Sequence, residues 1–232
     1  MKKLNYDYLM IGSGISGLSA AKKLAGLGTT CVISKSYLKE CATNYAQGGI
    51  AAALSSDDTP KIHKADTIKA GGGLCNEEAV SILVEEGVER VQDLISIGAS
   101  FDKIGAKYDF TKEGAHTKQR VLHAGDETGK EIERSIASAV QKEQKVDFLE
   151  NTTVVRLLVK DNICFGCLAI HNKEKILIYA KAVILAAGGC GQIYSRNTNP
   201  TIATGDGISL AFYAGAEVQD MEFIQFHPTT LH

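Results

Sequence analysis

A glycine-rich turn near the N-terminus, residues 12–17 with the sequence Gly-Ser-Gly-Ile-Ser-Gly, constrains the fold of this chain more than any other feature. The apolar run Tyr8–Ile11 before it has the pattern of a buried parallel strand. Leu18–Ala25 after it predicts a helix, and Thr30–Ile33 predicts the next strand. The order strand, glycine turn, helix, strand predicts a β-α-β unit of the doubly wound α/β class.

Each glycine of the turn has a separate physical reason. Gly12 permits the tight turn, Gly14 lets the backbone approach a pyrophosphate, and Gly17 lets the helix pack closely on the strand. A pyrophosphate would then lie at the positive end of the helix. We therefore expect a nucleotide site; the alternative is a glycine-rich turn without a ligand. The expected cofactor contacts here are Gly12, Ser13, Gly14, Ile15, Ser16 and Gly17.

The end of the second predicted strand departs from the pattern of NAD-binding proteins. An acidic residue usually stands there and binds the ribose, whereas this chain has Ser34 and Lys35. Ser34 could donate a hydrogen bond to a ribose, and Lys35 could reach a phosphate or the adenine edge. This difference makes an NAD-dependent dehydrogenase less favoured.

A second ligand segment, Cys41–Ala53, follows this unit. Gly48 and Gly49 allow the backbone to approach a flat ligand, because no side chain stands in the way. The small residues after them would let a helix pack tightly behind. Such a stretch suits an isoalloxazine ring better than a nicotinamide. The expected contacts are Ala42, Thr43, Asn44, Tyr45, Ala46, Gln47, Gly48 and Gly49.

This second segment resembles the flavin-contacting segment of the succinate dehydrogenase, fumarate reductase and L-aspartate oxidase flavoproteins. In the first two groups a histidine of this segment commonly carries the flavin covalently. Alignment on residues 47–49 puts Ala42 at that position, and an alanine cannot form the bond. The resemblance therefore implies non-covalent FAD, as in the L-aspartate oxidases.

Secondary-structure signals continue along the whole chain. Residues 60–100 are predicted to be helical, 101–125 to form a loop or ribbon, and 128–141 to form another helix. Strands are expected at Phe148–Leu158 and Ile163–Ile178, with turns at residues 160–162 and 171–173, as a small antiparallel β-meander inserted at residues 145–180. Lys181–Ala187 is expected to return as a buried parallel strand ending at Gly188, and Asp206 to open a helix. By the resemblance, Gly188 and Asp206 lie at the FAD; a simple helix cap is the alternative for Asp206.

Composition excludes several function classes. A net charge of −2 gives no electrostatic footprint for nucleic acid or anionic lipid. No apolar run approaches the ~20 residues that span a bilayer, and we expect a cytoplasmic protein. The six cysteines are scattered, and the pair Cys164 and Cys167 is read as two strand residues, so neither disulfides nor a metal site is expected.

Two clusters suggest substrate chemistry. In the first, residues 112–126, Glu113 could orient a substrate ammonium, and His116 or Arg120 could bind a carboxylate. A solvated loop is the alternative. The phrase resembles a stretch of the L-aspartate oxidases in which the glutamate orients substrate. In the second, alternation predicts a strand from Glu222 to His227, and the resemblance implies that His227 binds a substrate carboxylate.

The resemblance covers Asp7 to Leu231 and implies oxidation of L-aspartate, or a related dicarboxylate, to iminoaspartate. Oxygen or fumarate would accept the electrons, and quinolinate synthase is a conceivable partner in NAD biosynthesis. Residues 1–232 would form the N-terminal part of the FAD-binding domain, truncated before a capping domain that supplies the proton-transferring arginine. The alternatives are a fumarate reductase or succinate dehydrogenase fragment, and a catalytically silent flavin-binding module.

Overall fold

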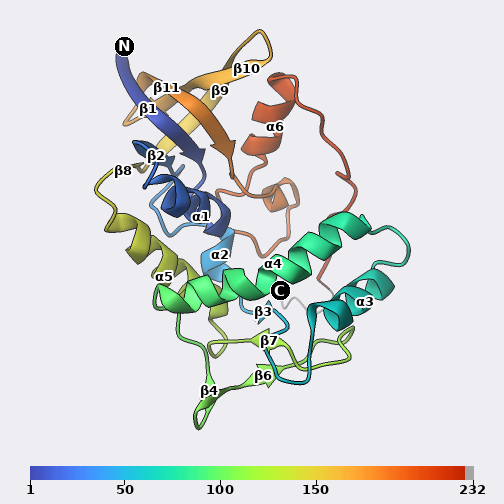
Figure 1. Ribbon diagram of the computed structural model, residues 1–232. Helices are drawn as coiled ribbons and strands as arrows, with labels where there is room; N and C mark the ends of the chain where they lie inside the picture. The colour runs from blue at the N-terminus through green and yellow to red at the C-terminus, as the bar shows by residue number, and fades with distance from the viewer. Residues whose placement is uncertain (228–232) are drawn as a thin grey trace. The chain divides into compact units, whose positions relative to one another are not determined.

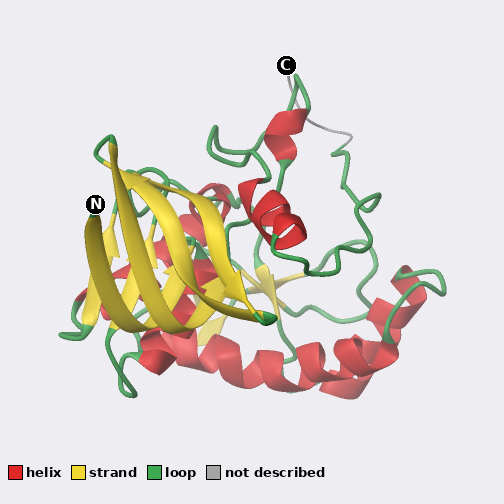
Figure 2. Cartoon of the chain, turned by 90° about the horizontal axis from the view of Figure 1, so that it is seen from above, coloured by secondary structure: helices red, strands yellow, loops and turns green. Residues whose placement is uncertain are grey.

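The computed structural model describes residues 1–227 (Figure 1). The first strand, which leads into the glycine-rich turn, belongs to a six-stranded sheet. The strand order is β8-β2-β1-β11-β10-β9. Viewed from above, the strands twist strongly relative to one another, as in most open sheets (Figure 2). The strands are β1 (Lys2–Ile11), β2 (Thr30–Ile33), β8 (Val146–Leu149), β9 (Thr152–Lys160), β10 (Ile163–His171) and β11 (Glu174–Leu185).

The parallel half of this sheet confirms the predicted β-α-β unit. β1 pairs in parallel with β2 and with β11, and β2 pairs in parallel with β8. Helix α1 (Ile15–Leu24) packs on β1, β2 and β11 and buries Leu18 and Ala21 completely. β1 begins at Lys2, six residues before the predicted start, because its polar first half also pairs with β11. The expected α/β class with a mainly parallel sheet is thus confirmed.

The antiparallel half of the sheet corrects two predicted boundaries. β11 is one continuous strand of 12 residues, antiparallel to β10 on one edge and parallel to β1 on the other. The meander therefore shares its last strand with the parallel sheet, and Lys181–Leu185 is not a separate or buried strand. The predicted strand Phe148–Leu158 is divided instead, because Asn151 takes a positive φ of 50° between β8 and β9.

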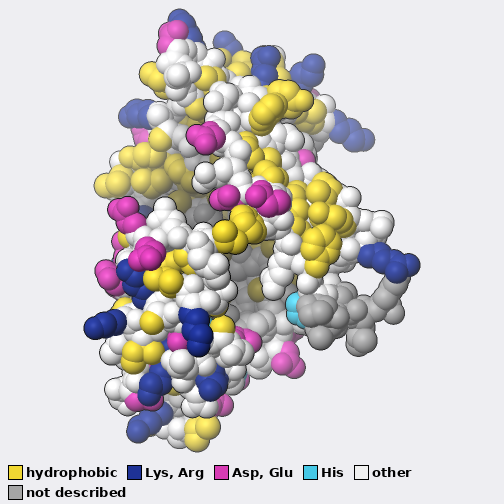
Figure 3. Space-filling view, turned by 90° about the vertical axis from the view of Figure 1, so that its right-hand side faces the viewer, with side chains coloured by type: hydrophobic (Ala, Val, Ile, Leu, Met, Phe, Trp, Pro, Cys, Tyr) yellow, Lys and Arg dark blue, Asp and Glu magenta, His cyan; other side chains and the backbone are white. Residues whose placement is uncertain are grey.

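The chain after β11 crosses a short 3₁₀ helix, η1 (Gly191–Ile193), and reaches α6 (Asp206–Tyr213), whose predicted start is confirmed. The predicted strand at Glu222–His227 is wrong, because these residues pair with no strand in the described chain. Residues 228–230 of the same motif lie outside the described residues. Four aromatic side chains of α6 and the chain after it are exposed: Phe212, Tyr213, Phe223 and Phe226. Figure 3 shows hydrophobic side chains in patches on one face of the surface.

Residues between these sheet segments form helices and short ribbons. The predicted helical region consists of α3 (Pro60–Ala70) and α4 (Glu77–Ser96), which pack against each other. The Asn76 side chain caps α4 by accepting from the amide of Ala79. Leu83 of α4 is 65% exposed. The ribbons are β3 (Ile50–Ala51), β4 (Lys103–Ile104), β5 (Lys107–Tyr108), β6 (Phe110–Thr111) and β7 (Val121–Leu122).

Backbone contacts divide the chain into two units, Met1–Thr43 with Ala137–His232, and Asn44–Ile136. Both boundaries fall within helices, α2 (Ala42–Tyr45) and α5 (Thr128–Gln141). The core of the first unit contains side chains from five strands, including Leu9, Cys31, Val154, Cys167 and Ile178. In the part of the chain that is described, no helix combines the length and the apolar character needed to cross a membrane.

Candidate functional site

A cavity of about 670 Å³ opens in the first unit at the carboxyl ends of β1, β2 and β11. This is the edge of an open α/β sheet at which ligands bind in most such folds. The cavity brings together many residues that the sequence singled out from distant segments. They are Gly12, Ser13, Gly14, Ile15, Ser16, Ser34, Lys35, Ala42, Thr43, Gly188 and Asp206.

The first residues of α1, Ile15 and Ser16, line this cavity together with the cap residue Gly14. Gly14 has no side chain to satisfy the first helical amides, and the first turn contains no acidic residue. The amide of Ile15 is held by the hydroxyl of Thr43 at 3.1 Å. The helix end therefore keeps its positive character, which suits the pyrophosphate of a dinucleotide.

Two glycines of the turn are required by backbone packing. Gly12 has a φ of +118°, and a Cβ added to it would overlap the carbonyl of Ala186. A Cβ on Gly17 would overlap the carbonyl of Gly12, so α1 can approach the turn only through a glycine. Gly17 is buried and lies outside the cavity lining. Its place agrees with the packing role that the sequence predicts for it.

The residues after β2 form a polar network on the cavity wall. Ser13 donates to the carbonyl of Leu38 at 2.8 Å and lies 3.2 Å from the hydroxyl of Ser34. Lys35 donates to Asp206 at 2.6 Å and to Thr204 at 2.6 Å. Lys35 therefore lines the cavity as part of an ion pair within the protein.

Asp206 does not cap its own helix: no side-chain capping bond is present at the start of α6. Its two carboxylate oxygens accept from Lys35 and from the hydroxyl of Thr204. Partial burial acts to raise the pKa of Asp206, but these hydrogen bonds outweigh it and lower the pKa. The carboxylate is thus held in a fixed, ionised state on the cavity wall.

Sequence reasoning missed several cavity residues. Thr152, Thr153 and Val154 of β9 line the cavity because the amide of Thr152 bonds to the carbonyl of Ser34 at 2.9 Å, next to the end of β2. No local sequence pattern predicts this contact between Thr152 and Ser34. Ala186 and Ala187 also line the cavity. Their position at the end of the predicted returning strand, directly before Gly188, is a signal that could have identified them.

The predicted flavin-contacting residues Asn44, Tyr45, Ala46, Gln47, Gly48 and Gly49 belong to the second unit. After them the structure has a short strand, β3. A Cβ added to Gly49 would overlap Val121 and Leu122 of β7. The close approach that Gly49 permits is therefore to a neighbouring strand of its own unit.

Glu113 lies exposed on the connection between β6 and β7, residues 112–120, which we call the Glu113 loop. Its carbonyl accepts from the amide of His116 at 3.0 Å, which closes a turn. His116 packs edge-on against the ring of His63 from α3, with 5.8 Å between ring centroids. The Glu113 carboxylate is therefore presented on the surface by an ordered loop.

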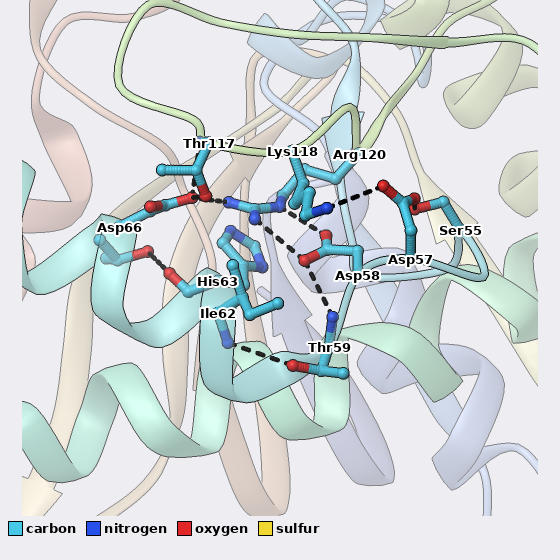
Figure 4. A network of polar contacts seen from close by, with 11 residues as sticks. Ser55, Asp57, Asp58, Thr59, Ile62, His63, Asp66, Thr117, Lys118 and Arg120 are labelled. Carbon is cyan, nitrogen blue, oxygen red and sulfur yellow. Dashed lines mark hydrogen bonds and ion pairs between the residues drawn. The ribbon is translucent and has the colours of Figure 1, made fainter.

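Arg120, at the end of this loop, has a different role from the one suggested by the sequence. It is fully buried, and its guanidinium donates to Asp58 at 2.7 and 3.0 Å and to Asp66 at 2.7 Å (Figure 4). Burial acts to lower the pKa of Arg120, but the hydrogen bonds to both carboxylates outweigh it. Arg120 therefore holds this unit together and is not a carboxylate ligand for substrate.

The other two histidines of interest lie in different surroundings. His123 contacts the carboxylate of Asp102 at 3.0 Å, and the same carboxylate accepts from the amide of Gly125. His227 is exposed and lies in neither a helix nor a strand. Cys164 and Cys167 lie in β10 as free cysteines, which confirms that they are strand residues.

Comparison with known sequences places residues 7–232 in the family described as FAD binding domain. The chain is 44% identical to L-aspartate oxidase 2-b, chloroplastic, of Nicotiana tabacum, over 97% of this chain and 36% of that protein. It is 44% identical to an L-aspartate oxidase of Streptomyces coelicolor and 40% identical to one of Synechocystis, again over 97% of its length. It spans only 40% and 41% of those two proteins, respectively.

Solved structures give the same picture of the fold. A mutant E. coli quinol fumarate reductase FrdA matches all of this chain with a TM-score of 0.97 and 30% identity, over 40% of its own length. The Sdh1 complex of Mycobacterium smegmatis matches 92% of this chain with a TM-score of 0.85 and 29% identity, over 39% of its own length. The fold at the cavity is therefore that of the flavoprotein subunits of such enzymes.

Proposed function

The chain belongs to the FAD binding domain family, and on that premise we propose that it forms the N-terminal FAD-binding part of an L-aspartate oxidase. The intact protein would oxidise L-aspartate to iminoaspartate, with oxygen or fumarate as electron acceptor, as the first step of quinolinate and NAD biosynthesis. One observation supports this choice within the family. Identity reaches 44% with L-aspartate oxidases, against 30% with the fumarate reductase.

The cavity of the first unit fits the adenosine diphosphate part of FAD. The N-terminus of α1 would hold the pyrophosphate, and Gly12 and Gly14 line the cavity beside it. Ser34 and Asp206 offer polar oxygens on the cavity wall. Residues 44–49 remain our proposed contacts to the ring system. When bound, FAD supplies the two-electron redox chemistry, while the protein supplies binding, orientation and electrostatics.

We expect FAD to be held without a covalent bond. Ala42 lines the cavity, and its methyl group has no atom that could attack the flavin. Acid precipitation of the intact protein that contains this chain should release all of its yellow colour into the supernatant. Flavin that stays on the precipitated polypeptide, detected by fluorescence of the washed pellet, would show that the assignment of Ala42 is wrong.

Glu113 is our proposed partner for the substrate ammonium. It is exposed on an ordered loop, and an ionised carboxylate is a strong acceptor for an ammonium group. His227 is proposed to bind a substrate carboxylate. The proton-transferring group is not assigned among the described residues.

Glu113→Gln should separate these roles in the intact protein. Loss of one charge-assisted hydrogen bond costs about 1.5–3 kcal/mol, so kcat/KM for L-aspartate should fall roughly 10- to 150-fold. Fumarate has no amine, so the rate of fumarate reduction should change much less. Both rates are measured on the same preparation. An equal loss in the two reactions would mean that Glu113 has a general structural role.

A fumarate reductase or succinate dehydrogenase flavoprotein is the second candidate. The TM-score of 0.97 with a fumarate reductase favours it, although the L-aspartate oxidases are closer in sequence. A catalytically silent flavin-binding module is the third. Cytoplasmic location remains a prediction from the sequence, and contact with quinolinate synthase remains a prediction from the resemblance. The tobacco relative carries the description chloroplastic.

A further inference from the structure

The Glu113 loop is fastened to helix α3 by one carboxylate oxygen. Oδ2 of Asp66 accepts from the backbone amide of Thr117 at 2.8 Å and from the Thr117 hydroxyl at 2.9 Å. The same oxygen accepts from Arg120 at 2.7 Å. Figure 4 shows Thr117 and Arg120 both directed at Asp66. One acidic side chain of α3 thus binds two residues of the loop, Thr117 and the buried Arg120.

Asp58, the other carboxylate on Arg120, makes a different set of contacts. Its two oxygens accept from Nε and from one terminal nitrogen of Arg120, and it also accepts from the amide of Thr59. None of these donors belongs to residues 113–117. The two carboxylates therefore differ in what they bind: Asp58 makes the larger share of the ion pair with Arg120, at the end of the loop, and Asp66 also accepts from Thr117 within the loop.

Other contacts restrain the loop beside this point. The ring of His116 packs edge-on against His63, which projects from α3 one turn before Asp66. Lys118 pairs with Asp57 at 2.9 Å, but both side chains are partly exposed, so this pair adds little. Only three residues separate Glu113 from Thr117, so the fastening of Thr117 limits where Glu113 can lie.

The Asp66 carboxylate that binds Thr117 stays ionised over a wide pH range. Burial acts to raise the pKa of Asp66, but hydrogen bonds from Thr117 and Arg120 outweigh it and lower the pKa to about 2. The carboxylate therefore stays ionised at every pH from mildly acidic upwards. Hydrogen bonds to a charged acceptor are roughly twice as strong as neutral ones, so the two bonds from Thr117 stabilise the position of the loop on α3.

We propose that Asp66 is the positioning residue for Glu113, acting through Thr117 to hold the loop in the conformation that receives the substrate ammonium. This inference rests on the proposed function, in which Glu113 contacts the substrate. It assigns substrate selectivity to a side chain that touches no substrate. It also predicts that Asp58 and Asp66 differ in their effects although both pair with Arg120.

The test compares four substitutions in the intact, FAD-loaded protein: Asp66→Ala, Thr117→Val, Thr117→Ser and Asp58→Ala. The first readout is hydrogen exchange of the amides of residues 113–117, which needs no substrate. Exchange should accelerate in Asp66→Ala and in Thr117→Val, stay unchanged in Thr117→Ser, and change little in Asp58→Ala. Asp58→Ala should nevertheless lose more stability than Thr117→Val, since it breaks two bonds to Arg120.

The second readout is the ratio of kcat/KM for L-aspartate oxidation to kcat/KM for fumarate reduction. This ratio should fall about tenfold in Asp66→Ala, less in Thr117→Val, and stay unchanged in Thr117→Ser and Asp58→Ala. In a Glu113→Gln background, Thr117→Val should cause no further fall, because the two residues act in series. If Asp66→Ala does not fold, the proposal is tested by comparing Thr117→Val with Thr117→Ser.

The outcomes separate the two claims. A wild-type protein that does not oxidise L-aspartate refutes the proposed function, while the exchange experiment still decides whether Asp66 holds the loop. The role of Asp66 alone is overturned if the wild-type protein oxidises L-aspartate but Thr117→Val behaves like Thr117→Ser. In that case the two variants have the same ratio of kcat/KM values, and hydrogen exchange of residues 113–117 is unchanged in both. An additive effect of Thr117→Val on Glu113→Gln overturns it as well.

Discussion

Arg120→Met is expected to lower the free energy of unfolding by about 3–5 kcal/mol, one of the two largest effects we predict. Arg120 is completely buried, and its removal leaves the carboxylates of Asp58 and Asp66 without a counter-charge in the interior. Methionine fills much of the same volume, so the loss reports the missing charge and not a cavity. Urea denaturation of the intact protein measures the change.

Lys118→Met is the matched control for that substitution. Lys118 lies two residues away and also pairs with an aspartate, but its side chain is 35% exposed and Asp57 is 67% exposed. An exposed pair contributes only about 0–1 kcal/mol. If both substitutions cost the same small amount, Arg120 is not the buried ion-pair centre described above.

Gly12→Ala is the second substitution with a large expected effect. A non-glycine residue at a φ of +118° carries strain of about 1–3 kcal/mol, and the new methyl group would also overlap the carbonyl of Ala186. The turn must then move away from β11, which displaces the N-terminus of α1 from the cavity. Both the free energy of unfolding and the affinity for FAD should fall, as measured by denaturation and by flavin fluorescence titration.

Gly26→Ala provides the comparison for Gly12. Gly26 follows the same helix and has no positive φ, and a Cβ added to it would meet no atom within 4 Å. Its substitution should change stability by no more than about 0.5 kcal/mol and leave the affinity for FAD unaltered. A Gly12→Ala protein that binds FAD as tightly as Gly26→Ala would remove the glycine turn from the binding site.

The sequence predicts best where the signal is local. The turn at residues 12–17, the strand Thr30–Ile33 and the helix Thr128–Gln141 follow from glycine placement and from apolar periodicity, and the structure confirms all three. Predicted strand boundaries are wrong where one strand pairs with two different neighbours along its length. β11 reads as two segments because its pattern of burial changes where the antiparallel neighbour ends.

Partners distant in sequence explain the remaining differences. Lys35 was expected to reach a ligand, but its partner, Asp206, stands 171 positions later in the chain. Arg120 looked like a loop cation, because nothing near it in sequence shows that Asp58 and Asp66 enclose it. The strand predicted at Glu222–His227 fails for the opposite reason: alternation is present, but these residues pair with no strand in the described chain.

The most direct test of the central claim is anaerobic mixing of the intact, FAD-loaded protein with L-aspartate or with succinate, followed by visible absorbance. We predict that L-aspartate removes the yellow colour and that succinate does not, because Glu113 selects a substrate that carries an ammonium group. Loss of colour with succinate, and none with L-aspartate, would contradict the assignment and favour a succinate dehydrogenase or fumarate reductase flavoprotein.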